Sequence, residues 1–271
     1  MSFDYEQSIW GRGEASLLWS QPTAFRLRQA LTAMQSLPTG SSVLEVGCGA
    51  GQFIRAVKKI RPEFSCFGCD ISHEAINAAE ENRDGVIYSV SDSQHFPYAD
   101  RVMDAVLIFD VLEHVETPEQ LLAEVRRVLK PGGILYAFVP CEGDWLSLWH
   151  LLDWLHLKRN LTRQHAGHIQ YFSRRELFSL VWQENFKINR VRYSEHLLGQ
   201  MAGVAAFWLM GRAAKRRGLK QINNESYFNE SAQSNSLIRL IKIMLNGLIY
   251  LESRIFSSLP SPNVHITAQK L

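Results

Sequence analysis

The order of apolar and polar residues predicts strands and helices that alternate along most of the chain. Short apolar runs have the length of buried strands, and the segments between them place apolar residues at helical spacing. Alternation of this kind indicates a parallel sheet with helices on both faces. The predicted strands are 42–46, 64–69, 86–90, 104–110, 134–139, 186–193 and 264–268, and the predicted helices are 52–60, 72–82, 117–129 and 173–184.

Polar residues at the predicted helix starts support these boundaries. Ser72 precedes one helix, and Thr117 precedes another with proline at its first position and Gln120 at its third. Ser173 and Glu176 have the spacing of a capping box. Residues 130–133, Lys-Pro-Gly-Gly, are expected to end the helix before the fifth strand.

Two stretches are longer than the alternating pattern requires. Residues 141–164 are rich in Trp and Leu, and residues 196–262 contain two helical patterns, at 197–217 and 236–256. Both leave the carboxyl ends of strands, so we expect them to form one helical cap there. We also expect their apolar faces to be buried against each other, because burial of a large apolar side chain contributes about 1.5–3 kcal/mol.

These patterns predict four parts of the chain. An N-terminal helical segment, 1–36, precedes a core at 37–193 with its insertion at 141–164. A helical cap follows at 194–262, and 263–271 is the last strand of the core.

Composition narrows the possible partners. The net charge of +2 over 271 residues is too small to predict nucleic-acid binding. The most apolar stretch, 197–211, is shorter than the roughly 18 residues that a membrane span needs, so only a peripheral membrane contact is expected. The chain opens without a secretory signal and its four cysteines have no disulfide spacing, which favours a cytoplasmic location.

The pair Cys66-x-x-Cys69 has the spacing of redox and metal motifs. Both residues fall within a predicted strand, where a thiolate is not stabilised, and no second pair completes a zinc site. We therefore expect buried structural cysteines and no metal.

A glycine-rich turn follows the first strand, in the sequence Glu-Val-Gly-Cys-Gly-Ala-Gly at 45–51. Glycines allow close approach of the backbone to a ligand, and the helix that follows offers free N–H groups to an anion. The third glycine comes one residue earlier than in the G-x-G-x-x-G pattern of dinucleotide sites.

Together with several later segments, this turn resembles class I S-adenosylmethionine-dependent methyltransferases of the small-molecule type. The matching segments are Asp70 at the end of the second strand, Ser91-Asp92-Ser93 after the third, 96–104, 109–115 and 129–133. The resemblance implies a Rossmann-like, doubly wound seven-stranded sheet whose last strand is antiparallel. It also implies S-adenosylmethionine as the cofactor.

The resemblance also implies roles for single residues. Gly47, Cys48, Gly49 and Gly51 would hold the methionine end of the cofactor, and Glu45 would orient their loop. Asp70, with Ile71 beside it, would bind the ribose. The adenine would contact Asp92 and Ser93, and the backbone of Phe109 would lie beside the methionine ammonium.

A histidine-containing segment, 165–173, follows the fifth strand. Many small-molecule methyltransferases of this class have a similar histidine four residues before a phenylalanine, which here is His168. His168 is the first candidate for a general base, or for a residue that shapes the pocket without moving protons. His165, Glu142 and Asp144 are further candidates for the base.

These features predict methyl transfer to a small, apolar or lipid-linked acceptor, with an oxygen acceptor favoured. Two other hypotheses stay open. One is a nicotinamide-dependent oxidoreductase, against which the glycine spacing and Asp92 argue. The other is a non-catalytic accessory module, against which the intact glycine turn and both acids argue. The oligomeric state is not predicted.

Overall fold

A computed structural model describes residues 6, 9–92, 94–155, 167–217 and 236–271. The predicted candidates Ser93 and His165 lie outside the described residues. The strands are β1 (Ser42–Val46), β2 (Ser65–Asp70), β3 (Ile87–Val90), β4 (Met103–Phe109), β5 (Leu129–Pro140), β6 (Phe186–Ser194) and β7 (Asn263–Lys270). The helices are α1 (Ala24–Ala33), α2 (Gln52–Ile60), α3 (His73–Glu80), η1 (Leu112–His114), α4 (Pro118–Val128), α5 (Leu148–Trp154), α7 (Arg174–Gln183), α8 (Leu197–Arg217) and α10 (Ser236–Phe256).

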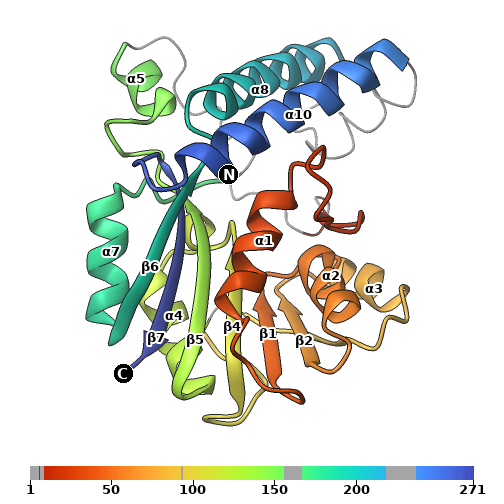
Figure 1. The fold of residues 1–271 in the computed structure, drawn as a ribbon, viewed down its shortest axis with the longest axis vertical. Helices are drawn as coiled ribbons and strands as arrows, with labels where there is room; N and C mark the ends of the chain where they lie inside the picture. Colours follow the sequence, from red (N-terminus) through yellow and green to blue (C-terminus); the bar gives the residue numbers. More distant parts are fainter. Residues whose placement is uncertain (1–5, 7–8, 93, 156–166, 218–235) are drawn as a thin grey trace.

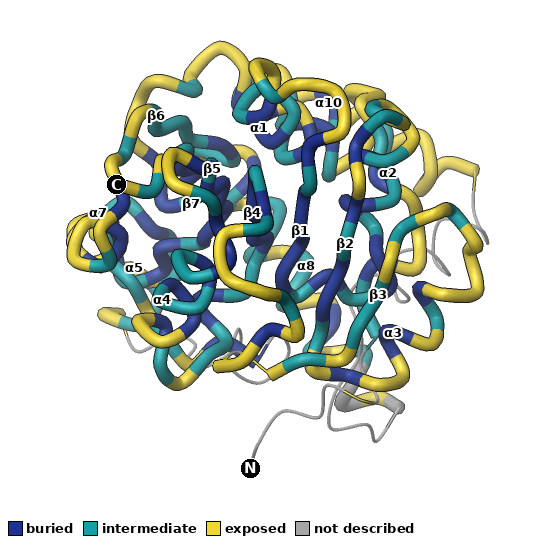
Figure 2. Tube along the Cα trace, turned by 90° about the horizontal axis from the view of Figure 1, so that it is seen from below, coloured by how far each residue is buried: buried dark blue, intermediate teal, exposed yellow. Residues whose placement is uncertain are grey.

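Among the described residues, seven strands form one sheet in the order β3-β2-β1-β4-β5-β7-β6. Strands β1 to β5 run parallel to one another, and β7 runs antiparallel to both β5 and β6. The predicted seven-stranded Rossmann-like sheet with an antiparallel last strand is therefore confirmed. Its strands stay buried through the middle of the molecule, and most exposed segments lie around them (Figure 2).

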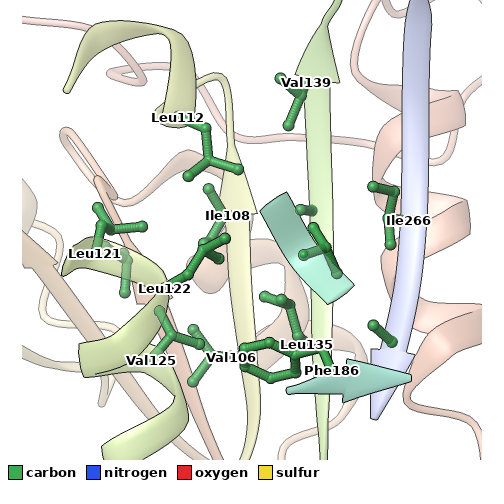
Figure 3. Close-up of a cluster of buried hydrophobic side chains, with 14 of the residues drawn as sticks. Val106, Ile108, Leu112, Leu121, Leu122, Val125, Leu135, Val139, Phe186 and Ile266 are labelled. Carbon is green, nitrogen blue, oxygen red and sulfur yellow. The ribbon is translucent and has the colours of Figure 1, made fainter. Parts of the chain in front are cut away.

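Helices cover both faces of the sheet because successive strand residues point to opposite faces. In β4, Ala105 and Leu107 pack with α1 and α2, whereas Val106 and Ile108 pack with α4 and α7. Figure 3 shows the face of the sheet on which Val106 and Ile108 lie. Side chains of β4, β5 and β7 pack there together with those of α4. The residues labelled there are Val106, Ile108, Leu112, Leu121, Leu122, Val125, Leu135, Val139, Phe186 and Ile266.

The helix starts confirm two of the three capping predictions. The Ser72 hydroxyl accepts from the N–H of Ala75, and Ser173 and Glu176 form the predicted capping box. Thr117 does occupy the position before α4, but its side chain makes no capping bond and donates instead to the side chain of Gln120.

Residues 130–133 do not separate helix from strand as predicted. Strand β5 begins directly after α4, at Leu129, which pairs with Met103. The ammonium of Lys270 donates to the carbonyl of Leu129, and Gly132 takes a φ of 73°. The glycines therefore form an irregularity inside the strand, held by its neighbours.

The described helices of the two insertions lie together over the carboxyl ends of the parallel strands, where a helical cap was predicted. Helices α8 and α10, here called the cap helices, lie side by side across that edge, with α5 beside them (Figure 1). Glu252 of α10 accepts from the N–H groups of Leu197 and Leu198 at the start of α8. The N–H of Leu148, at the start of α5, donates to the Gln200 side chain.

The expected burial of the cap's apolar faces is wrong. Ten large apolar side chains of α10 are between 37 and 63 % exposed. Helix α10 contacts α1, β6 and α8, so only part of its surface packs against the rest of the protein. Among the described residues, no helix is long and apolar enough to cross a membrane.

Candidate active site

The glycine turn after β1 adopts a shape that needs glycine. Gly47, Gly49 and Gly51 have φ values of 68°, 52° and 82°, where side chains are strained. A Cβ atom on Gly49 would lie 2.6 Å from the carbonyl oxygen of Trp10, and one on Gly51 would lie 2.5 Å from the Tyr88 hydroxyl. The N–H groups of Gly47 and Cys48 donate to the carbonyl of Cys69 at 2.8 and 3.0 Å. The turn is thus held by neighbouring backbone.

Glu45 lies behind this turn. Its carboxylate is buried and accepts from the N–H of Ile54 at 2.7 Å, in the first turn of α2. Burial raises the pKa of Glu45 well above its usual range, and the Ile54 N–H opposes this shift. Glu45 thereby joins the end of β1 to the start of α2, which supports the predicted orienting role.

Asp70 ends β2 beside the glycine turn. Its two oxygens accept from the N–H groups of Gly49 and Ser72, at 2.8 and 3.0 Å. Burial raises the pKa of Asp70, although both N–H groups favour the charged form. The next residue, Ile71, is exposed at the mouth of the cavity.

Asp92 follows β3 and is exposed at the same edge of the sheet. The N–H groups of Gln94 and His95 donate to one of its oxygens at 2.9 and 2.7 Å and lower its pKa. Phe109 ends β4, and its ring stacks on Phe53 with the centroids 3.9 Å apart. The structure therefore brings the described cofactor candidates of four strand ends to a single cavity, except Gly51, which does not line it.

The N-terminal segment adds contacts that sequence reasoning missed. The Glu6 carboxylate accepts from the hydroxyl of Ser72 and the N–H groups of His73 and Glu74. The carbonyl of Trp10 accepts from the N–H of Ala50 at 2.8 Å. An acid near a helix start is a familiar signal, but nothing in the sequence connects Glu6 with a helix 66 residues away.

Four side chains meet beside the cavity, and we call them the acid–histidine cluster: Glu113, His114, Glu142 and His168. Three of them line the cavity, whereas Glu113 is fully buried and does not. His168 Nδ1 lies 3.0 Å from Glu142 Oε1, close enough for an ion pair although not aligned as a hydrogen bond. The rings of His114 and His168 meet edge to face, with centroids 4.9 Å apart. The cluster joins the segment after β4 to the segments after β5 and before α7.

Charge within the cluster decides which groups hold protons. Burial disfavours a charged His168, but Glu142 and the further acids Glu113 and Asp110 outweigh it and raise its pKa to about 9. Burial lowers the pKa of His114 to about 3, with the charge of His168 acting in the same direction. Burial and the neighbouring Asp110 raise the pKa of Glu113. At neutral pH, His168 is therefore the protonated histidine of the pair.

Asp144, the other acidic candidate for the base, is occupied elsewhere. Its carboxylate accepts from the guanidinium of Arg174 at 2.8 and 3.1 Å and from the N–H of Leu146. Its pKa is lowered because these donors outweigh burial. We therefore assign it to holding the segment after β5 against α7.

A half-buried arginine also lines the cavity. Arg26 of α1 pairs with Asp110 at 2.5 Å and with Glu195 at 3.3 Å. Both acids take a left-handed backbone, with φ values of 52° and 51°. Sequence reasoning missed all three residues because they come from distant segments with no motif in common.

One cavity of about 1460 Å³ connects these groups. The glycine turn, Asp70 and Asp92 line one part of it, and His114, Glu142 and His168 line another. The cap helices form its roof with small and apolar residues. They include Ala202, Gly203, Ala206, Ile241, Leu245, Ile249 and Tyr250.

The sheet order, the glycine turn and the acids at the strand ends define a class I methyltransferase fold with a site for an adenosyl cofactor. Residues 19–191 match the family described as "Methyltransferase domain", and the chain belongs to this family. Membership implies S-adenosylmethionine as the cofactor, which agrees with the sequence-based prediction.

Two curated relatives show how varied the acceptors of similar proteins are. The chain is 32% identical over 138 residues to a tRNA (carboxymethyluridine(34)-5-O)-methyltransferase of Arabidopsis thaliana, covering 49% of this chain and 32% of that relative. It is 31% identical over 110 residues to the ubiquinone/menaquinone biosynthesis C-methyltransferase UbiE of Desulfotalea psychrophila, covering 40% of this chain and 45% of that relative. The similarity thus spans less than half the length of either protein.

Similarity of structure covers more of the chain than similarity of sequence does. The crystal structure of the cyclase SpnF superimposes with a TM-score of 0.59 at 20% identity, covering 97% of this chain and 86% of that one. At this identity the likeness concerns the fold alone. Because this similar structure is of a cyclase, the fold does not by itself specify methyl transfer.

Proposed function

We propose that this protein transfers the methyl group of S-adenosylmethionine to an oxygen of a small, apolar or lipid-linked acceptor. The observation that supports this most directly is the single cavity shared by the glycine turn and the acid–histidine cluster. Methyl transfer from a sulfonium needs alignment of donor and acceptor, exclusion of water and, for a hydroxyl acceptor, removal of a proton. The cavity contains groups suited to each task.

The cofactor part of the cavity would bind through backbone and carboxylate groups. The glycine turn and the N–H groups at the start of α2 would hold the methionine end. Asp70 would accept from the ribose hydroxyls and Asp92 from the adenine amino group. The sulfonium itself supplies the activated methyl group.

The acid–histidine cluster would receive the proton of the acceptor. With His168 protonated at neutral pH, its N–H can donate to the acceptor oxygen, and the Glu142 carboxylate beside it is the nearest base. This supports the pocket role of His168 more than the role of a free base. The apolar cap helices above the cluster favour an acceptor with a hydrocarbon portion.

Mass spectrometry of cell extract treated with the protein and isotopically labelled cofactor tests the reaction. Lipid, aqueous small-molecule and RNA fractions are separated first, since the name of one relative states tRNA and that of another states ubiquinone/menaquinone biosynthesis. We expect the label in the lipid fraction. Label in RNA alone would contradict the acceptor class, and tight NAD binding without S-adenosylhomocysteine binding would restore the oxidoreductase hypothesis.

We also propose a peripheral membrane contact through the cap helices, on the side of the molecule where they cover the cavity. The exposed apolar surface of these helices supports it. This surface exposes Leu240, Met244 and Leu251, each more than half accessible. The two helices contain seven basic residues and one acidic residue, whereas the whole chain has a net charge of only +2. An apolar surface with a basic excess fits an anionic lipid headgroup region.

Sedimentation with lipid vesicles tests this contact. We expect the full chain to bind phosphatidylglycerol vesicles and to bind phosphatidylcholine vesicles less. Leu240→Glu combined with Met244→Glu should abolish binding, while Trp182→Glu, at an even more exposed apolar residue of α7, should leave it unchanged. Equal binding by both variants would remove the cap helices from the contact.

A further inference from the structure

Glu113 has an unusual environment for a carboxylate. It is fully buried in η1, and among the described residues neither of its side-chain oxygens has a hydrogen-bond partner. An unsatisfied buried carboxylate is costly unless it is paired or coordinates a metal. A nearby positive charge would offset this cost, and it can come from the protonated His168 or from a bound cation that takes the place of its proton.

Two imidazoles lie where they can share such a ligand with Glu113. Ligand atoms from Glu113, His114 and His168 lie within 4.8 Å of one another. Metal–nitrogen and metal–oxygen bonds of about 2.0–2.2 Å bring neighbouring ligand atoms to roughly 3.5 Å. Small side-chain rotations would close the difference around a bound cation.

Outer contacts hold both histidines in place. His114 Nδ1 lies 3.3 Å from the carbonyl oxygen of Gly167, to which its N–H can donate, so that Nε2 keeps its lone pair. His168 Nδ1 lies beside the Glu142 carboxylate. Histidines that bind metals commonly have such a carbonyl or carboxylate at the second ring nitrogen.

We propose that Glu113, His114 and His168 bind a divalent transition-metal ion. Two imidazole nitrogens and one carboxylate favour Zn²⁺ or Mn²⁺ over Mg²⁺, which prefers oxygen ligands. The set leaves coordination positions open, and His114 and His168 line the cavity.

A metal held here would face the acceptor. An acceptor hydroxyl bound at an open position would lose its proton more easily, because the metal stabilises the oxyanion. Glu142, which lines the cavity beside His168, would accept that proton as well as orient the His168 ring. This part of the inference rests on the proposed function, whereas metal binding itself does not.

The sequence-based expectation of no metal considered cysteine pairs alone. His168 is 54 residues beyond His114 in the chain, and no spacing rule connects such distant ligands. The backbone of Glu113 brings them together, because its carbonyl oxygen accepts from the N–H groups of Ile169 and Gln170.

Equilibrium dialysis of the tag-free full chain against Zn²⁺, without cofactor or acceptor, tests the site. We expect one Zn²⁺ per chain and weaker binding of Mg²⁺. Glu113→Gln and His168→Ala should each lower the affinity for Zn²⁺ by about tenfold or more. His73→Ala, which changes an exposed histidine of α3, should not affect it.

The absorption spectrum of the wild-type chain loaded with Co²⁺ provides a test that needs no variant, since nitrogen and carboxylate ligands give characteristic visible bands. Absence of stoichiometric Zn²⁺ binding, Mg²⁺ binding as tight as Zn²⁺, or equal binding by wild type and Glu113→Gln would overturn the site. Calorimetry with S-adenosylhomocysteine on the same proteins separates the two proposals. A chain that binds this ligand and transfers methyl groups without metal would refute the metal's part in the reaction and leave the proposed function standing.

Discussion

The two parts of the cavity are built in different ways. At the cofactor part, backbone groups and carboxylates from consecutive strand ends bond to one another, as Gly47 does with Cys69 and Asp70 with Gly49. At the acceptor part, side chains from distant segments meet under two helices that leave much apolar surface exposed. A cofactor held mainly by backbone groups depends on one local chain shape, whereas an acceptor held by side chains depends on how distant segments pack. The cofactor part therefore follows from local sequence, and the acceptor part follows from tertiary contacts.

Replacement of His168 should separate the two parts most strongly. We expect His168→Ala to lower turnover on the order of 10²–10³-fold, because it removes a donor that would contact the acceptor oxygen. Calorimetry should show unchanged affinity for S-adenosylhomocysteine. A change in the Michaelis constant larger than that in turnover would indicate a residue that only shapes the pocket, and normal kinetics in both would exclude His168 from the site.

Replacement of Asp70 should instead weaken binding of the cofactor. Loss of its hydrogen bonds to ribose should cost roughly 1.5–3 kcal/mol, which is about tenfold or more in the affinity for S-adenosylhomocysteine. Asp92→Ala should cost less, because Asp92 is exposed to water. If calorimetry finds full affinity in a folded Asp70→Ala chain, the carboxylate is not a ribose ligand.

Ser173→Ala measures what a purely structural change does to either part. Ser173 and Glu176 form the capping box of α7, away from the glycine turn. We expect a loss of about 1 kcal/mol in the free energy of unfolding by urea, with S-adenosylhomocysteine affinity unchanged. An affinity loss would show that α7 and the cofactor part are coupled.

Glu45→Gln should give the smallest effect, and one that depends on pH. Burial raises the pKa of Glu45 in the folded chain, so the folded state binds a proton more tightly than the unfolded state does. Ionisation of Glu45 therefore lowers stability as pH rises above about 4.5, the ordinary pKa of glutamate. Glutamine can accept from Ile54 N–H without ionising.

We thus expect the melting temperature of Glu45→Gln relative to wild type to increase from pH 5 to pH 8. Thermal unfolding followed by circular dichroism at several pH values measures this difference. A difference that stays constant over this range would mean that Glu45 ionises in the folded chain as it does in water.

The sequence was sufficient for the parts of the structure that local rules govern. Most of strand β4 is a continuous apolar run, 105–109, between Asp104 and Asp110. The glycine turn after β1 has a spacing that differs from the dinucleotide pattern. Ser72 and Ser173 each cap a helix by accepting from an N–H group only three residues away. Where neighbours in space decided, local rules failed: β5 begins at Leu129 because Met103 pairs with it, despite the proline and glycines that follow.

The sequence by itself determined the sheet, the position of the cofactor turn and the presence of a cap, because each depends on periodicity or on residues close together in the chain. Only the tertiary structure placed Glu6 on α3, paired Arg26 with Asp110 and Glu195, and gathered Glu113 and His114 with His168. It also left the cap helices exposed, because α10 meets the protein along only part of its surface. Contacts between residues far apart in sequence depend on how whole elements pack, and no local pattern encodes that packing.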